Sequence, residues 1–235
     1  MKVAYTTAVE NNGEPGRIID PDKPMVALTF DDGPDAVDTP IILDILEANN
    51  AVATFFILGM EAEKNPEVLN RILEGGNEIG NHSFNHQSYL RLSDRDLFDQ
   101  LNTTQYIVTE ATGGYTPPFA RPPYGFLNDA LVEKIPMPII MWSLDTLDWE
   151  NKDAGTVYDN VFKDVKDGDI ILMHDIFAST TEAVKLVVPE LIRRGYQLVT
   201  VSELAEHRGV TLQQGNVYHN FYPQETPASR YNEKL

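Results

Sequence analysis

Short apolar segments alternate with longer amphipathic segments along the chain from Met25 onward. The apolar segments have the length and composition of buried strands, and the amphipathic segments repeat apolar residues at helical spacing. The pattern predicts strands at residues 25–30, 53–58, 78–80, 118–121, 138–142, 169–173 and 197–199.

Capping residues, prolines and glycines mark where the predicted helices begin and end. Thr39-Pro40 combines a capping hydroxyl with a proline at the first helical position. Gly75-Gly76 ends the next helix, because glycine readily adopts the conformation that closes a helix. Helices are predicted to begin at Thr39, Asn65 and Ser93, to cover residues 127–134, 157–165 and 181–194, and to begin again at Ser202.

Strands and helices that alternate without an internal linker predict a single α/β domain built on a parallel sheet. Such a sheet is either open and doubly wound or closed into a (β/α) barrel. Polar residues follow five of the strands, namely Asp31, His82, Arg121, Asp145 and His174. Strand ends meet at one rim of a barrel, whereas an open sheet spreads them along an edge, so the barrel is favoured. We expect a lead-in over residues 1–23 with at most one short strand, the barrel over 24–208, and an irregular tail over 209–235.

Composition narrows the classes of function. The chain has 235 residues, with 18 Lys+Arg against 36 Asp+Glu and a formal net charge of −18. This charge argues against nucleic-acid binding, which needs a basic face, and against attachment to anionic lipid through basic residues. Cysteine is absent, which excludes disulfides, a thiol nucleophile and Cys-ligated metal. No apolar run approaches the roughly 20 residues of a membrane-spanning helix.

Two carboxylates, Asp31 and Asp32, end the first strand and precede Gly33-Pro34. Neighbouring strand residues point to opposite faces, so the two acids should have different roles. The competing interpretation is a helix cap or Asx turn, which explains most Asp-Gly pairs. His82 and His86 lie four residues apart, and on a helical turn both rings would share one face suited to a metal ion. Two histidines that are close only by chance are the alternative.

An arginine and a further histidine also stand at strand ends. Arg121 precedes two prolines that stiffen its backbone, which suits either a rigid connector or a guanidinium held for a carboxylate. The backbone N–H that follows could then face a ligand. His174 ends a buried strand, where a histidine is more often structural than catalytic. A carboxylate on another strand end, such as Asp145, would fix its tautomer and raise its pKa, as a general acid requires.

Together these residues supply what metal-assisted hydrolysis requires. Two imidazoles and a carboxylate can bind a cation and leave positions open for water and substrate. A second carboxylate can act as the base beside that water, and the strand-end histidine can act as the acid. The assignment is Asp32, His82 and His86 for the metal, Asp31 held by Arg121 for the base, and His174 held by Asp145 for the acid.

Five segments resemble, in order, the five motifs of the polysaccharide deacetylases, which are carbohydrate esterase family 4 or the NodB homology domain. They are residues 29–34, 82–86, 121–125, 145–149 and 172–174, and the resemblance runs from about residue 25 to about residue 207. It implies a distorted (β/α) barrel of seven or eight strands. It also implies one divalent metal ion, usually zinc and sometimes cobalt.

The resemblance also implies roles for single residues. The metal ligands would be Asp32, His82 and His86, the base Asp31 and its positioning residue Arg121. The general acid would be His174, tuned by the aspartate of the fourth motif, Asp145. The backbone N–H of Tyr124 would help to stabilise the oxyanion, and Trp149 and Leu172 match residues that form the apolar pocket for the acetyl methyl group.

Three acetylated substrates compete within the resemblance. Residues 142–149 and 173–181 look most like bacterial cell-wall deacetylases, which favours N-acetylglucosamine of peptidoglycan over chitin oligomers and O-acetylated xylan. The products would be acetate and a free amino sugar. A wall polymer lies outside the cytoplasm, so we expect an extracellular or cell-wall-associated monomer whose export segment is absent from this sequence. A cytoplasmic location stays open.

Two other classes of protein share parts of this pattern. A non-haem iron oxygenase also uses two histidines and one carboxylate, but on a β-rich fold that the β/α alternation disfavours. A non-catalytic glycan-binding module on the same barrel would be expected to lack Asp31 or His174, and both are present.

Overall fold

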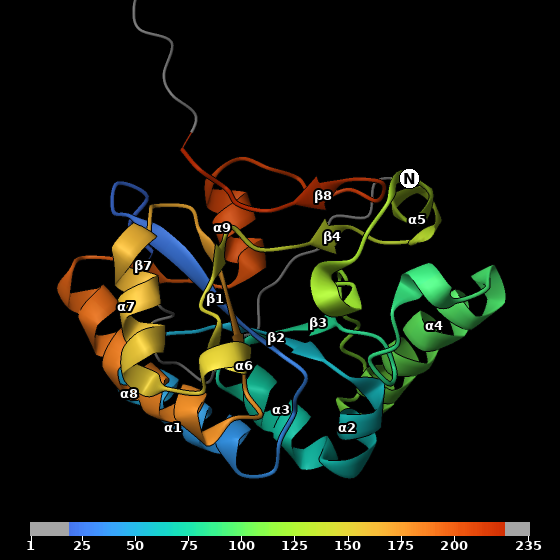
Figure 1. Ribbon diagram of the computed structural model, residues 1–235, viewed down its shortest axis with the longest axis horizontal. Coiled ribbons are helices and arrows are strands. Elements are labelled where there is room, and N and C mark those ends of the chain that lie inside the picture. The colour runs from blue at the N-terminus through green and yellow to red at the C-terminus, as the bar shows by residue number, and fades with distance from the viewer. Residues whose placement is uncertain (1–18, 224–235) are drawn as a thin grey trace, which may run out of the picture.

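The computed structural model describes residues 19–223 (Figure 1). Most of the expected lead-in, residues 1–18, and the end of the expected tail, residues 224–235, lie outside the described residues. The strands are β1 (Met25–Asp31), β2 (Thr54–Ile57), β3 (Glu78–Asn81), β4 (Ile139–Ile140), β5 (Leu144–Asp145), β6 (Ile170–His174), β7 (Gln197–Leu198) and β8 (Val217–Tyr218).

The helices follow the strands in the expected alternation. They are α1 (Asp38–Ala48), α2 (Gly59–Lys64), α3 (Pro66–Glu74), α4 (Asp94–Ala111), α5 (Asp129–Lys134), α6 (Asp148–Asn151), α7 (Ala154–Asp164), α8 (Ala178–Arg193) and α9 (Val201–His207). Two short 3₁₀ turns, η1 (Tyr89–Arg91) and η2 (Pro123–Gly125), lie in the loops. The short helices α2 and α6 were not expected, because neither is long enough to show a helical period.

The main sheet is parallel and has the order β3-β2-β1-β6-β5, with β7 paired to the beginning of β1. Ala120 bridges β3 to β4 through pairs with Asn81 and Ile139, and β4 pairs with β8. These short contacts continue the sheet around most of a cylinder. The structure therefore confirms the expected α/β class and distorted barrel, although the strand expected at residues 118–121 is reduced to the single bridging residue Ala120.

Alternate residues of β1 face two different layers. Val26, Leu28 and Phe30 pack against the outer helices α1, α3, α7 and α8, which form an arc around the sheet in Figure 1. Met25 and Ala27 belong instead to the cluster inside the barrel. Because side chains alternate along a strand, Asp31 faces the interior with them. The whole strand is buried, as expected for a parallel sheet covered on both faces.

Two expectations at the C-terminal side are wrong. Residues 209–223 are not wholly irregular, because β8 pairs with β4 and the buried Phe221 donates its amide to the carbonyl of Gly168. The strand is two residues long, so its signal is too short to detect from the sequence. The cap of α9 is Thr200 rather than Ser202, since Thr200 and Glu203 form a capping box.

Candidate metal centre and active site

The carboxyl ends of β1, β3 and β6 bring the candidate residues to one rim of the barrel. Asp31 lies beside His174 in the pairing of β1 with β6, and His82 follows the last residue of β3. Just beyond Asp31 the chain turns sharply. Asp32 has a left-handed backbone (φ 78°), and a Cβ at Gly33 would overlap the buried carboxylate of Asp175. The turn therefore aims the two neighbouring acids in different directions.

Three side chains at this rim offer ligand atoms to a single point. The ligand atoms of Asp32, His82 and His86 all lie within 4.8 Å of one another. Asp32 Oδ1 is 3.5 Å from Nε2 of His82 and 3.3 Å from Nε2 of His86. This oxygen is buried and has no hydrogen-bond partner. A buried carboxylate oxygen between two imidazole nitrogens fits a divalent cation that leaves coordination positions open.

The two histidines converge through a loop rather than on a helical turn, which corrects the expectation from their spacing. Ser83 and His86 both have left-handed backbones, with φ of 75° and 61°. The amide of His86 donates to Ser83 Oγ, and the amide of Ser83 donates to Asn81 Oδ1. These bonds hold the loop closed, and the ring centroids of His82 and His86 are 5.1 Å apart.

The backbone fixes which nitrogen of His82 faces the site. Its Nδ1 lies 2.7 Å from the carbonyl oxygen of Arg121, so it donates a proton there and leaves the lone pair of Nε2 free to bind a metal. Burial works against the charged form of this ring, but Asp31 and Asp32 outweigh burial and raise the pKa of His82. The site therefore has a negative potential that favours a cation.

The two imidazoles have the reverse effect on their carboxylate. Burial alone would raise the pKa of Asp32, but the nearby imidazole of His82 and the charges of His82 and His86 lower it to about 2. The pKa of His86 is lowered, first by burial and then by the charge of His82. An ionised carboxylate beside a histidine that tends to be neutral is the protonation state that metal ligation needs.

Arg121 is completely buried and holds Asp31. Its Nη1 donates to Asp31 Oδ1 at 2.6 Å and to Thr29 Oγ1 at 2.8 Å. Its Nε and Nη2 donate to the carbonyls of Ile140 and Met141, and its guanidinium lies over the ring of Phe56, 3.9 Å from the centroid. Each of the three guanidinium nitrogens thus has a hydrogen-bond acceptor. This geometry leaves Asp31 Oδ2, which is 3.6 Å from His82 Nε2, facing the candidate metal centre.

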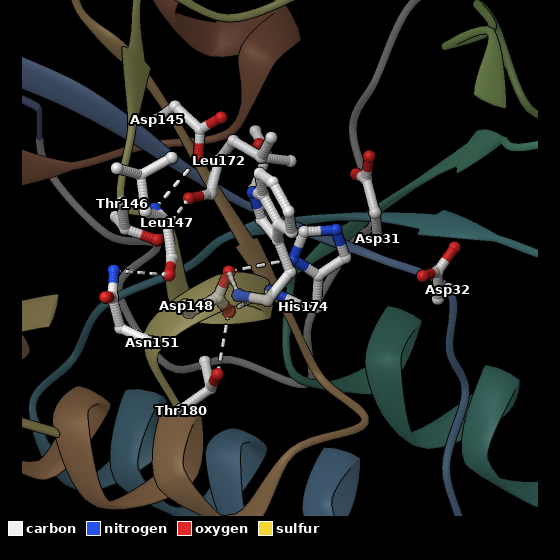
Figure 2. Close-up of polar contacts among 12 residues, drawn as sticks. Asp31, Asp32, Asp145, Thr146, Leu147, Asp148, Asn151, Leu172, His174 and Thr180 are labelled. Atoms are coloured by element: carbon white, nitrogen blue, oxygen red, sulfur yellow. Dashed lines mark hydrogen bonds and ion pairs between the residues drawn. The ribbon is translucent and has the colours of Figure 1, made fainter. Parts of the chain in front are cut away.

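The carboxylate that holds His174 is Asp148 and not Asp145, so the expected contact between Asp145 and His174 is wrong. Nδ1 of His174 lies 2.8 Å from Asp148 Oδ1, and its amide donates to Asp148 Oδ2 at 2.7 Å. Thr180 Oγ1 donates to the same carboxylate (Figure 2). Asp145 instead accepts the amide of Leu147, and Figure 2 draws no contact between Asp145 and the His174 ring.

The backbone after β5 explains this exchange. Leu147 adopts a left-handed conformation (φ 55°) directly before α6, which turns the buried first residue of that helix, Asp148, back under β6. Asp145 remains half-buried at the strand end, where burial raises its pKa. Both acids belong to the segment that the sequence singles out, but only the turn decides which one reaches His174.

Asp148 also sets the charge of His174. Burial disfavours the imidazolium, yet the hydrogen bond and charge of Asp148, with smaller contributions from Asp31 and Asp32, raise the pKa of His174 to about 9. Because Nδ1 is bound to Asp148, the proton that His174 can give away is on Nε2. A pKa of about 9 favours the protonated ring at neutral pH, so His174 can act as an acid.

Of the three residues expected to contact substrate, two lie in segments that follow strands and one lies within a strand. Tyr124 has a left-handed backbone (φ 63°) and packs its ring against His86, with centroids 4.4 Å apart. Tyr124 is 56% exposed and Trp149 is 48% exposed, whereas Leu172 is buried in β6. Exposed aromatic rings beside a polar centre are typical of a binding surface. Three further residues support the site: Thr29 accepts from Arg121, Asp148 holds His174, and Thr180 donates to Asp148. The sequence pattern did not identify the two threonines as site residues.

Comparisons with known proteins agree with this geometry. The sequence profile of the polysaccharide deacetylase family matches residues 19–136. The chain is 43% identical to peptidoglycan-N-acetylmuramic acid deacetylase PdaC of Bacillus subtilis, over 80% of this chain and 40% of the relative. It is 42% identical to peptidoglycan-N-acetylglucosamine deacetylase PgdA of Listeria monocytogenes, over 82% of this chain and 41% of the relative. The chain thus spans about two fifths of the length of these relatives.

Solved structures extend the likeness to the fold. The structure of PdaC superposes with a TM-score of 0.79, covering 81% of this chain and 94% of the solved chain at 42% identity. A family 4 acetyl xylan esterase from Clostridium thermocellum, solved with a cobalt ion, gives a TM-score of 0.79 at 32% identity and covers 83% and 98% of the two chains. The chain belongs to the polysaccharide deacetylase family.

Proposed function

We propose that the protein is a metal-dependent deacetylase that removes acetyl groups from N-acetylglucosamine units of peptidoglycan. The observation that carries the proposal is the orphaned Asp32 Oδ1 between two imidazole nitrogens, together with the Arg121–Asp31 pair and the Asp148–His174 pair. This arrangement holds metal ligands, a base and an acid around one point.

Asp32, His82 and His86 would hold the metal, for which we propose Zn²⁺. The set of two imidazoles and one carboxylate is typical of catalytic zinc, and a related acetyl xylan esterase holds a cobalt ion. When bound, a divalent cation polarises the acetyl carbonyl and acidifies a water molecule. Its charge would also satisfy the buried oxygen of Asp32.

The protein's own residues would move the protons. Asp31 Oδ2 accepts a proton from the attacking water, while Arg121 keeps the carboxylate aimed at it. The water oxygen forms a bond to the acetyl carbon, and the backbone N–H of Tyr124 stabilises the developing oxyanion. Nε2 of His174 then donates its proton to the sugar nitrogen as the carbon–nitrogen bond breaks. The products are a free amino sugar and acetic acid, which keeps the second proton of the water and then ionises to acetate. Asp31 gives its proton to solvent and His174 takes one back, which restores the site.

The choice of peptidoglycan is supported by the two relatives that are more than 40% identical, both named as peptidoglycan deacetylases. Acetyl xylan and chitin oligomers are the competing substrates, and an acetyl xylan esterase shares the fold. A purely glycan-binding role is disfavoured, because the base and the acid are both in place. Peptidoglycan lies outside the cytoplasm, which supports an extracellular or cell-wall-associated protein.

Acetate release tests the proposal. The protein is stripped with EDTA, reloaded with Zn²⁺ or Co²⁺, and incubated separately with peptidoglycan, chitin oligomers and acetylated xylan. We expect metal-dependent release, fastest from peptidoglycan. Release that is faster from xylan would reassign the substrate, and no metal-dependent release from any of the polymers would refute the function.

A further inference from the structure

A pocket of about 620 Å³ adjoins the candidate metal centre, and His86 and Tyr124 are its only lining residues that the proposed chemistry uses. Metal ligand His86 and the neighbouring Tyr124 form one wall, and Arg91, Asn85 and Phe126 lie around the rest. Its volume is within the range of small-molecule sites. Because it shares a wall with the centre, a polymer with one sugar at the metal would place an adjacent sugar here.

The pocket offers an aromatic surface and a free acceptor. The rings of Tyr124 and Phe126 lie 5.6 Å apart and are 56% and 53% exposed, so their faces are open to the C–H groups of a sugar ring. The side-chain oxygen of Asn85 is buried and has no hydrogen-bond partner. Unsatisfied buried acceptors are rare in proteins, and a rotation of the Asn85 side chain toward the pocket would let a sugar hydroxyl satisfy this one.

Arg91 gives the pocket a positive charge that no carboxylate at residues 19–223 pairs with. Six of the seven arginines at residues 19–223 form an ion pair with a carboxylate, and Arg91 is the exception. The nearest acids along the chain are already engaged, since Asp94 pairs with Lys134 and Asp96 accepts from Ser93. In a chain of net charge −18, an arginine left unpaired in a pocket is available for an anionic ligand.

We infer that this pocket binds the carboxylate-bearing sugar next to the one that is deacetylated, with Arg91 pairing with the carboxylate. The inference rests on the proposed function and deepens it. Peptidoglycan alternates N-acetylglucosamine with N-acetylmuramic acid, and only the latter carries a 3-O-lactyl group, which ends in a carboxylate or continues into a peptide stem that bears carboxylates. A carboxylate in the neighbouring position therefore puts N-acetylglucosamine at the metal.

The experiment compares three substrates and three proteins. The substrates are chitotetraose, a peptide-free tetrasaccharide that alternates the two peptidoglycan sugars, and the same tetrasaccharide with peptide stems. The proteins are the Zn²⁺-loaded wild type, Arg91→Gln, and the matched control Arg95→Gln. Arg95 lies four residues further along, in α4, is exposed, and pairs only with the exposed Asp99 at 3.8 Å. The readout is kcat/KM for acetate release.

We expect the wild type to prefer a carboxylate-bearing substrate over chitotetraose, and Arg91→Gln to lower this preference about tenfold, the usual worth of a charge-assisted hydrogen bond. Arg95→Gln should keep the preference. Added salt should weaken the preference of the wild type, because ions screen exposed pairs. Loss of preference for the peptide-free substrate identifies the lactyl carboxylate, and loss confined to the peptide-bearing substrate identifies the stem.

Three results would separate the failures. If Arg91→Gln and the wild type show the same preference for carboxylate-bearing substrates and both release acetate, the pocket does not bind the carboxylate through Arg91, but the proposed function stands. If mass spectrometry shows muramic acid rather than glucosamine as the deacetylated sugar, N-acetylmuramic acid lies at the metal, and the inferred placement of the two sugars is wrong. No metal-dependent release by the wild type overturns the proposed function itself.

Discussion

Replacing Asp148 by Asn removes the charge that holds His174 in its protonated form. The carboxylate accepts from the ring, the amide of His174 and the hydroxyl of Thr180, all at 2.7 to 2.8 Å. An amide of the same shape cannot supply that charge, and its NH₂ group cannot accept these bonds. Asp145→Asn is the matched control, because Asp145 lies on the same segment and contacts the Leu147 amide instead.

The size of the effect follows from the pKa of His174, which is about 9 in the protein against the ordinary value of 6.5. Without the charge of Asp148, burial lowers this pKa while Asp31 and Asp32 raise it, so the ordinary value is the reference for the variant. At pH 7.5 roughly 97% of the ring is protonated with a pKa of 9, and roughly 10% with a pKa of 6.5. The loss of acid alone therefore lowers kcat about tenfold at pH 7.5, and on the order of 75-fold at pH 8.5. Near pH 6 both forms are mostly protonated, so the remaining loss there reports the orientation of the ring.

The assay is a pH profile of kcat for the Zn²⁺-loaded wild type, Asp148→Asn and Asp145→Asn. Activity that needs protonated His174 falls as pH rises through its pKa, so the alkaline limb of Asp148→Asn should move to lower pH. Asp145→Asn should keep the alkaline limb of the wild type. A shift produced by Asp145→Asn and not by Asp148→Asn would refute the assignment of the partner. An unshifted limb in both variants would refute His174 as the titrating acid.

Three further predictions concern the metal centre and the stability of the barrel. Asp31→Asn should abolish turnover while Zn²⁺ still binds by calorimetry, whereas His82→Ala should lose both; full activity in either variant would contradict these roles. Gly33→Ala should destabilise the protein by about 1–3 kcal/mol, seen as a lower Tm, because its methyl group overlaps the Asp175 carboxylate; an unchanged Tm and Zn²⁺ affinity would show that the turn yields. Burial raises the pKa of Glu78 from 4.5 to about 7. The unfolded chain therefore releases this proton at lower pH than the folded protein does, and the free energy of unfolding falls by about 3 kcal/mol as pH rises from about 4.5 to 7. Glu78→Gln should flatten that slope in urea unfolding with EDTA present, and an unchanged slope would assign it to other groups.

The sequence by itself determined the elements and the chemistry they could carry. The alternation of apolar and amphipathic segments predicted the parallel β/α architecture, because buried strands and helices have different periods. The position of Asp31, His82, Arg121 and His174 at strand ends predicted that they would meet, since the strand ends of a barrel share one rim. Two-residue strands such as β8 left no readable pattern.

Only the tertiary structure decided which neighbours touch. The spacing of His82 and His86 fits a helical turn, yet left-handed residues close a loop that brings the same rings together. Asp145 and Asp148 are both acids at a strand end, and the turn at Leu147 delivers Asp148 to His174. Arg91 gave no signal in the sequence, because its missing partner is visible only once the surrounding carboxylates are placed. Local patterns constrain which residues can share a strand or helix, whereas side-chain contacts between elements depend on backbone turns that those patterns do not encode.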